Sequence, residues 1–292
     1  MLLSKQYELI GNTPIIKLND KYFKNSIIYA KLECFNLTGS IKDRPVYQII
    51  KRLYETKKID KDTTIIEYSS GNTGISLSAL CNVFKNKCII VMPKSMSKQR
   101  RKMIKKYNAT LVLVDGGMQS AKNKAYELLE NIDNAILLNQ FGDESNIKAH
   151  YKTAQEILED IPDVEAIVCG IGTGGTITGI GEYFKENNIN IKLFGVEPEE
   201  SPLLTKNYAG SHKIQGIGAN FIPPLLKREV ITEILTVPSK EALKYQKQFI
   251  KNDGLFLGIS SGAVLYGAIK VLEKYHFKKI AIICPDSGDR YI

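Results

Sequence analysis

A lysine at the start of a predicted helix is the first residue whose position could support covalent chemistry. It is Lys42, in the run Asn36-Leu-Thr-Gly-Ser-Ile-Lys-Asp-Arg44. The helix dipole opposes a cation at this end, so the position would lower the pKa of the ammonium group and favour a nucleophilic amine or a Schiff base. Taken alone, this position favours an ordinary surface lysine over a catalytic one, because lysines are plentiful in this chain.

A glycine-rich turn supplies a possible anion site. Residues 166–169 are apolar and bounded by glycine, as in a buried parallel strand, and helical spacing of apolar residues begins at Thr176. Between them, several backbone N–H groups lie at a helix N-terminus, where the dipole also favours an anion. We therefore predict a phosphate-binding loop made of Gly172, Thr173, Gly174, Gly175 and Thr176.

The same glycines leave other interpretations open. Gly170, Gly172 and Gly175 fit G-x-G-x-x-G, and Glu197 ends the next apolar run about 22 residues further on, which is the spacing of a dinucleotide-binding fingerprint. A phosphate-bearing cofactor or substrate, a dinucleotide and a purely structural turn all remain possible at this point.

A second unit of strand, turn and helix lies at residues 63–85. Its turn presents the polar side chains of Ser69, Ser70, Asn72 and Thr73 at a helix start, which suits a bound carboxylate. A simple capped helix is the structural alternative, since Ser and Thr also favour that position. The density of donors favours a ligand site.

Patterns typical of strands and of helices alternate regularly along the chain. Such alternation predicts an α/β fold with mostly parallel sheets covered by helices on both faces. We predict strands at 27–32, 63–68, 88–92, 110–114, 135–139, 166–169, 192–196 and 279–284. We predict helices at 41–56, 73–85, 97–107, 119–131, 145–159, 174–187, 240–252 and 262–275.

Composition narrows the class of protein. The chain has 292 residues, 43% of them hydrophobic, with no run of 18 apolar residues and no long apolar region at its N-terminus, so we expect a soluble, cytoplasmic protein without a membrane span. The five cysteines lack C-x-x-C spacing and the three histidines form no ligand pair, so we predict no metal site. The net charge is +9, but the densest basic run, Lys98 to Lys106, has the pattern of an ordinary amphipathic helix, so we expect no nucleic-acid partner.

Taken together, the motifs resemble the cysteine synthase and cystathionine β-synthase family, the fold type II pyridoxal-phosphate enzymes. They occur in family order over nearly the whole chain, and the dinucleotide interpretation is therefore disfavoured. The matching runs are Ile10-Gly-Asn-Thr-Pro14, Gly39-Ser-Ile-Lys-Asp-Arg44, Ser70-Gly-Asn-Thr-Gly74, Met92-Pro93, Met96-Ser97, Gly172-Thr-Gly-Gly-Thr176, Val196-Glu-Pro198, Lys213-Ile-Gln-Gly-Ile-Gly218, Gly258-Ile-Ser-Ser-Gly262 and Pro285-Asp-Ser-Gly288.

The resemblance implies roles for individual residues. Lys42 would hold pyridoxal 5'-phosphate as a Schiff base, residues 172–176 would bind its phosphate, Asn72 its ring hydroxyl, and Ser260 its pyridine nitrogen. The substrate site would comprise Ser69, Ser70, Asn72, Thr73 and Gln140 for the α-carboxylate, together with Gly216 and Asn220.

The resemblance also implies a reaction and an architecture. An amino acid would lose a group from Cβ to give an α-aminoacrylate, and sulfide or a thiol would add; O-acetylserine and sulfide giving cysteine is the main hypothesis. The fold would be tryptophan synthase β-like, with a smaller mobile domain at 35–148 carrying the carboxylate loop and a larger domain from 1–34 and 149–292 carrying the phosphate loop. A homodimer is implied as well.

One departure keeps alternatives open. Cysteine synthases usually carry glycine where this chain has Asn220, and cystathionine β-synthases tend to carry aspartate. If Asn220 is functional, the enzyme could release hydrogen sulfide from cysteine and form lanthionine or cystathionine; the residue is equally consistent with a surface substitution. An alternative of another class is a non-catalytic pocket that binds a partner's C-terminus, as some relatives bind serine acetyltransferase.

Overall fold

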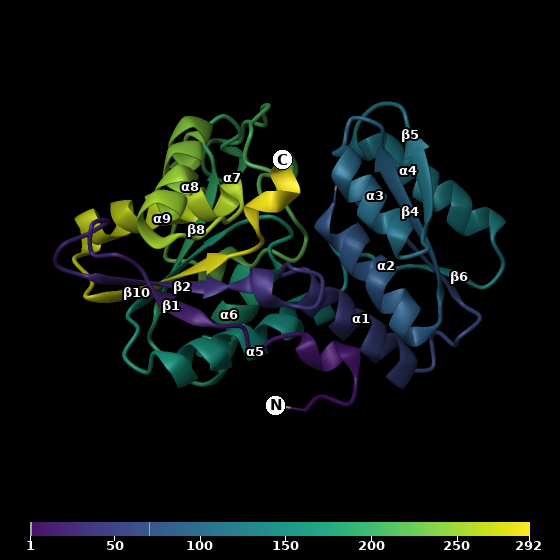
Figure 1. Ribbon diagram of the computed structural model, residues 1–292, viewed down its shortest axis with the longest axis horizontal. Helices are drawn as coiled ribbons and strands as arrows, with labels where there is room; N and C mark the ends of the chain where they lie inside the picture. Colours follow the sequence, from purple (N-terminus) through teal and green to yellow (C-terminus); the bar gives the residue numbers. More distant parts are fainter. Residues whose placement is uncertain (1, 70) are drawn as a thin grey trace.

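Two sheets organise the chain, and they lie on opposite sides of the molecule (Figure 1). The computed structural model describes residues 2–69 and 71–292. The larger sheet has six strands in the order β1-β2-β10-β7-β8-β9, and all neighbours are parallel except β1 and β2. Its strands are β1 (Ile15–Lys17), β2 (Ile27–Leu32), β7 (Ala166–Gly170), β8 (Lys192–Pro198), β9 (Glu233–Val237) and β10 (Lys279–Cys284).

The smaller sheet has four parallel strands in the order β5-β4-β3-β6. It is built from the middle of the chain, whereas the larger sheet takes strands from both ends. Its strands are β3 (Thr64–Tyr68), β4 (Lys87–Pro93), β5 (Thr110–Val114) and β6 (Ala135–Leu137). The predicted domain boundaries at residues 35 and 148 stay a prediction.

Helices connect the parallel strands and cover the sheets. The α-helices are α1 (Asp43–Glu55), α2 (Asn72–Phe84), α3 (Lys98–Lys106), α4 (Met118–Asn131), α5 (Ser145–Asp160), α6 (Gly175–Glu186), α7 (Leu203–Lys206), α8 (Ser239–Asp253) and α9 (Ile259–Tyr275). The described residues also form short 3₁₀ turns, which are η1 (Gln6–Leu9), η2 (Glu33–Phe35), η3 (Arg228–Val230) and η4 (Gly288–Tyr291). The C-terminal turn η4 lies between the two sheets (Figure 1). Within the described residues, no helix has the length and apolar character needed to cross a membrane.

Both faces of each sheet are buried. Along β10, Ile282 packs into a cluster with α8 and α9, and its neighbour Ile283 packs into a second cluster with α5 and α6. In the smaller sheet, Ile65 packs against α1 and α2, and Ile66 packs against α4. Successive strand residues face opposite sides, which is why these strands read as continuous apolar runs.

The α/β fold with mostly parallel sheets is confirmed, and all eight predicted strands are present. Two further strands were not predicted: β1 is only three residues long and mostly exposed, and β9 is an edge strand with little full burial, so neither forms a long apolar run. The short helix α7 was missed too. Strand β6 ends earlier than predicted, and Asn139 beyond it turns the chain with a φ of +59°.

Candidate active site

The glycine-rich loop follows β7 directly and leads into α6. Gly174 has a φ of +82°, a conformation that L side chains rarely adopt. A Cβ on Gly172 would lie 2.5 Å from the carbonyl oxygen of Gly216, and one on Gly175 would lie 2.1 Å from Oδ1 of Asn146. The loop can therefore approach Gly216 and Asn146 this closely only because residues 172 and 175 are glycine. Phosphate binding by Thr173, Thr176 and the glycines stays a prediction.

A buried histidine supports this loop, and the sequence analysis gave it no role. The Nε2 atom of His150 on α5 lies 3.2 Å from the Thr176 hydroxyl, and its Nδ1 atom lies 3.2 Å from the Thr153 hydroxyl. Burial, with the charges of Arg44 and Lys42, holds the pKa of His150 well below its usual range. The imidazole is thus neutral at physiological pH. Only the packing of α5 on α6 brings it to the loop.

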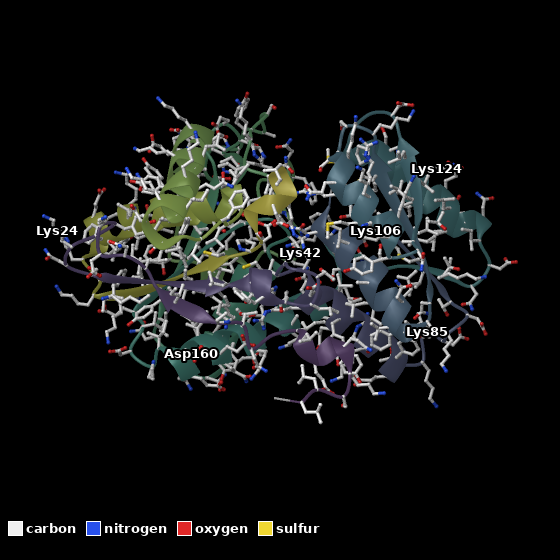
Figure 2. All side chains as sticks on the ribbon, viewed as in Figure 1. Lys24, Lys42, Lys85, Lys106, Lys124 and Asp160 are labelled. Atoms are coloured by element: carbon white, nitrogen blue, oxygen red, sulfur yellow. The ribbon has the colours of Figure 1, made fainter. Side chains whose placement is uncertain are left out.

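Lys42 lies at the centre of the molecule, between the two sheets. It is the residue before α1, and its side chain lines the same pocket as Gly172, Thr173 and Thr176. Figure 2 contrasts it with Lys24, Lys85 and Lys124, which lie nearer the edges of the molecule. Burial lowers the pKa of the Lys42 amine, and the charge of Asp286 partly opposes that effect. The interpretation of Lys42 as a surface lysine is therefore excluded.

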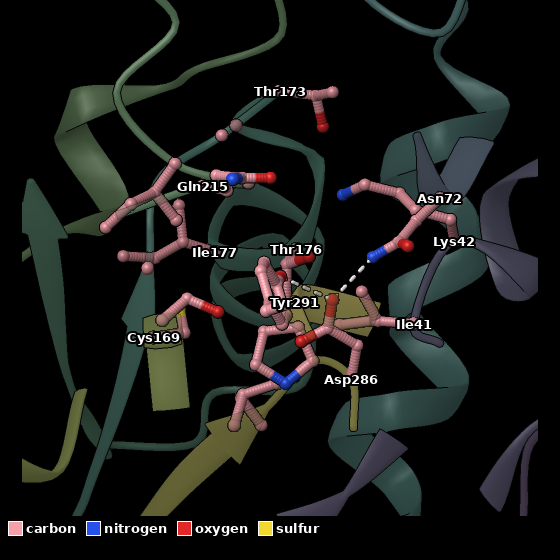
Figure 3. A pocket seen from close by; sticks show the side chains of 18 residues that line it. Ile41, Lys42, Asn72, Cys169, Thr173, Thr176, Ile177, Gln215, Asp286 and Tyr291 are labelled. Carbon is pink, nitrogen blue, oxygen red and sulfur yellow. Dashed lines mark hydrogen bonds between the residues drawn. The ribbon is translucent and has the colours of Figure 1, made fainter. Parts of the chain in front are cut away.

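Asp286 is a buried carboxylate in this pocket that the sequence analysis quoted within a motif without assigning a role. Its Oδ2 atom accepts hydrogen bonds of 2.7 Å from Asn72 Nδ2 and 2.7 Å from the Tyr291 hydroxyl (Figure 3). Its Oδ1 atom is buried and has no hydrogen-bond partner among the described residues. Burial raises the pKa of this carboxyl group.

Asn72 and Ser260 also line the pocket. Asn72 begins α2, and its Oδ1 atom accepts a 2.6 Å hydrogen bond from Nη1 of Arg290. The Asn72 amide is thus held by the carboxylate of Asp286 at its nitrogen and by the guanidinium of Arg290 at its oxygen. Ser260 is buried in the first turn of α9. The predicted contacts of these two residues with a cofactor ring stay predictions.

The predicted carboxylate loop joins β3 to α2. The Ser69 hydroxyl accepts hydrogen bonds of 3.1 Å from the N–H groups of Gly71 and Gly74, and Thr73 donates a 2.6 Å bond to Oε1 of Gln140. Gln140 in turn donates to buried Glu67 at 3.1 Å. Ser69, Thr73 and Gln140 therefore lie together, while Ser70 lies outside the described residues.

A cleft of about 930 Å³ opens beside the lysine pocket and shares Lys42, Asn72 and Thr173 with it. One wall comes from the carboxylate loop, and the other carries Gly216 and Asn220 from the larger sheet's side. The arrangement brings the two predicted binding loops to one cavity from opposite sheets.

Asn220 is exposed on the cleft wall. Its φ is +59°, which asparagine tolerates better than most residues, and its Oδ1 atom accepts a 2.9 Å hydrogen bond from the Ser201 hydroxyl. Among the described residues, no hydrogen-bond partner is found for its amide nitrogen. Asn220 therefore fits both a role in substrate binding and a surface substitution.

Glu197 does not serve the glycine-rich loop. Its buried carboxylate accepts hydrogen bonds of 2.8 Å and 2.9 Å from the N–H groups of Leu204 and Thr205, at α7. The acid of a dinucleotide fingerprint would need to face a ribose instead. This contact removes the remaining support for that interpretation.

Comparisons with known proteins agree with this geometry. The family model described as pyridoxal-phosphate dependent enzyme matches residues 7–286. A cysteine synthase B of Campylobacter jejuni is 48% identical over 292 residues, which cover 99% of this chain and 96% of that protein.

Solved structures give the same likeness. A hydrogen sulfide-producing enzyme from Fusobacterium nucleatum has a TM-score of 0.95 at 39% identity, with all of both chains covered. A cysteine synthase from Entamoeba histolytica has a TM-score of 0.96 at 37% identity, covering 100% of this chain and 89% of the other.

Proposed function

Because this chain belongs to the family of pyridoxal-phosphate dependent enzymes, we propose that it replaces the group on Cβ of an amino acid, with O-acetylserine and sulfide as substrates and cysteine as product. The observation that carries the proposal is the amine of Lys42, which lines one pocket together with the glycine-rich loop. Its lowered pKa suits an amine that must bind a carbonyl group and later accept a proton.

The pocket fits the cofactor. Glycine at 172 and 175 lets the loop pack closely against the Gly216 carbonyl and the Asn146 side chain, and the start of α6 offers backbone donors for a phosphate. Ser260 is a neutral partner for the pyridine nitrogen, and Asn72 has a second amide hydrogen for the ring hydroxyl. When bound through Lys42, pyridoxal phosphate supplies an electron-withdrawing ring that stabilises negative charge at the substrate's Cα.

The chain's own groups then bind the substrate and move its proton. The donors around Ser69, Thr73 and Gln140 orient the α-carboxylate. Lys42 takes the proton from Cα and later returns it, and loss of the Cβ substituent makes Cβ open to sulfide. The smaller unit at 35–148 carries the carboxylate loop, and its closure over the cleft would exclude water.

The test of this function is product formation by the purified protein. We expect cysteine from O-acetylserine and sulfide, and no cysteine when either substrate is omitted. Protein that contains bound cofactor yet makes no cysteine from this pair would contradict the proposed substrates.

Replacing Lys42 with alanine tests the role of the amine. We expect the visible absorbance near ~410–420 nm to disappear and turnover to fall at least about 1,000-fold, because no other lysine lines this pocket among the described residues. Lys24→Ala, at the periphery, is the matched control. Normal turnover by Lys42→Ala would overturn the mechanism.

A second candidate is release of hydrogen sulfide from cysteine, with lanthionine or cystathionine formed when cysteine or homocysteine adds. It is favoured by Asn220, a polar side chain on the cleft wall where cysteine synthases usually have glycine. Sulfide release from cysteine alone would support it, and Asn220→Gly should then reduce that release more than it reduces cysteine synthesis. Unchanged rates of both reactions would make Asn220 a neutral surface residue.

Assembly and location follow from the resemblance and the thiols. We propose a homodimer, which light scattering tests. We also propose that the cleft accepts the C-terminal carboxylate of serine acetyltransferase, which competition between a C-terminal peptide and O-acetylserine tests. All five cysteine thiols are free, which fits a reducing, cytoplasmic compartment. A pocket that binds such a peptide but turns over no substrate would favour the non-catalytic alternative.

A further inference from the structure

Asp286 is tied to the chain segment that carries Lys42. The N–H group of Ile41 donates a 2.8 Å hydrogen bond to the Pro285 carbonyl, and Ser40 forms a bridge with Asp286. The carbonyl of Asp286 also accepts a 3.0 Å bond from Gly258, just before α9. The backbone thus holds this carboxylate between the lysine and the start of α9.

The surrounding residues leave space for the carboxylate and orient it. A Cβ on Gly258 would lie 2.0 Å from Oδ1 of Asp286, so only glycine leaves room there. Oδ2 accepts from Asn72 and Tyr291, and Oδ1 is buried without a partner among the described residues. A buried unpaired carboxylate oxygen is costly, and such groups are retained at functional sites.

We propose that Asp286 is a positioning residue of the cofactor pocket, whose carboxylate orients the Asn72 amide and stabilises the protonated amine of Lys42. This inference rests on the proposed function only in so far as Lys42 is the lysine that holds the cofactor. The Asn72 amide has two hydrogens; one binds Asp286 at 2.7 Å, and the other is left for a ring oxygen. Arg290 donates a hydrogen bond to the Oδ1 atom of the same amide and so prevents the amide from flipping.

Asp286 and Lys42 line the same pocket, where burial lowers the pKa of the Lys42 amine and the carboxylate of Asp286 opposes that effect. A lysine that takes a proton from Cα becomes an ammonium group in a site poor in water, where a nearby carboxylate stabilises it. The other charged groups that act on Asp286 are Arg290 and Arg100, and its titratable neighbours are Tyr291, Cys34 and Cys284.

Asp286→Asn is the decisive variant, because it removes the charge and keeps an oxygen that can accept from Asn72. We expect the pH midpoint of the visible band of the lysine-bound cofactor to fall by about one unit or more. In the full-length protein freed of cofactor, acetylation of the Lys42 amine can be measured over a range of pH by mass spectrometry of the peptide that contains it. The pH midpoint of this acetylation should shift in the same direction. Neither reading requires turnover, so a wrong substrate assignment would appear in the cysteine assay alone.

Two further variants serve as controls. Asp289 lies three residues away and is exposed, so Asp289→Asn should leave both midpoints unchanged. Tyr291→Phe removes a hydrogen bond to Asp286 and keeps its charge, so it should not lower the Lys42 midpoint. Unchanged midpoints in Asp286→Asn, or an equal fall in Asp289→Asn, would overturn the proposal.

Discussion

At the scale of single residues, the carboxylates of this protein differ sharply in environment. Glu67 is buried behind the carboxylate loop, where it accepts hydrogen bonds from Gln140 and from the N–H group of Asn139. Burial raises its pKa to about 8, against 4.5 in an open chain. No cation pairs with it in the part of the chain that the structure describes, so its negative form is disfavoured by desolvation.

Glu67 should therefore make stability fall as pH rises. Its folded-state pKa lies above the unfolded value, so the folded protein binds more protons between about pH 4.5 and pH 8, and the stabilisation is lost through that window. We expect Glu67→Gln to flatten the dependence of the melting temperature on pH in this range. Glu130→Gln, at an exposed position, should leave the wild-type slope. The same slope in both variants would show that Glu67 does not titrate as described.

At the scale of elements, the unit of β7, glycine-rich loop and α6 is defined by close backbone contacts. Gly172 approaches the carbonyl of Gly216, and α6 packs on α5 through Gly179, where a Cβ would lie 2.2 Å from the Ile147 carbonyl. Two segments distant in sequence thus set the loop's position. A backbone carbonyl cannot move aside as a flexible side chain can.

Gly172→Ala should consequently lose cofactor, because its Cβ would lie 2.5 Å from the Gly216 oxygen and must displace one wall of the pocket. We expect at least about a tenfold weaker retention of pyridoxal phosphate, measured by dialysis and absorbance. Gly117→Ala is the control, since a Cβ there meets nothing within 4 Å. Equal retention by both variants would contradict this account of the loop.

At the scale of the whole molecule, a buried ionic network joins the parts around the two sheets. Arg44 on α1 pairs with Glu33 at 2.6 Å and with Glu156 on α5 at 2.7 Å, and Lys31 on β2 also pairs with Glu156 at 2.7 Å. Since α1 packs on the smaller sheet's core and α5 on the larger sheet's core, these charges lie at the junction. The N–H group of Asn12 adds a 2.9 Å bond to Glu156.

Removing Arg44 should destabilise the protein strongly, because two carboxylates would stay buried without their main partner. We expect Arg44→Met to cost about 3–5 kcal/mol in urea unfolding. Arg52→Met on the same helix removes a more exposed pair with Asp143, in which the two side chains are 34% and 13% exposed, and should cost less than about 1 kcal/mol. Burial acts to raise the pKa of Glu156, but hydrogen bonds and charges from Arg44 and Lys31 lower it to about 2. The contribution of this carboxylate to stability is therefore complete above about pH 4.5 and is lost as pH falls toward 2. Similar costs for both arginine variants would argue against the network.

Features of the fold and site that depend on consecutive residues could be predicted from the sequence. Apolar runs of strand length predicted eight of the ten strands found in the described residues, and glycines between a strand and a helix predicted the loop at 172–176. Both signals are present in consecutive residues. Lys42 was singled out by its place at a helix start, although its burial was not foreseen.

The set of residues that meet in the pocket depends on long-range packing. Asp286 and Tyr291 reach it from the segment after β10 and from the C-terminal turn, and His150 on α5 contacts the glycine-rich loop through Thr176. Asp286 stood within a matching motif, but its sequence did not indicate a role for its carboxylate. The edge strand β9 and the use of Glu197 at α7 were equally invisible. Burial, charge pairing and the direction of a side chain are set by segments far apart in the chain, so they become defined only when the two sheets are formed and packed.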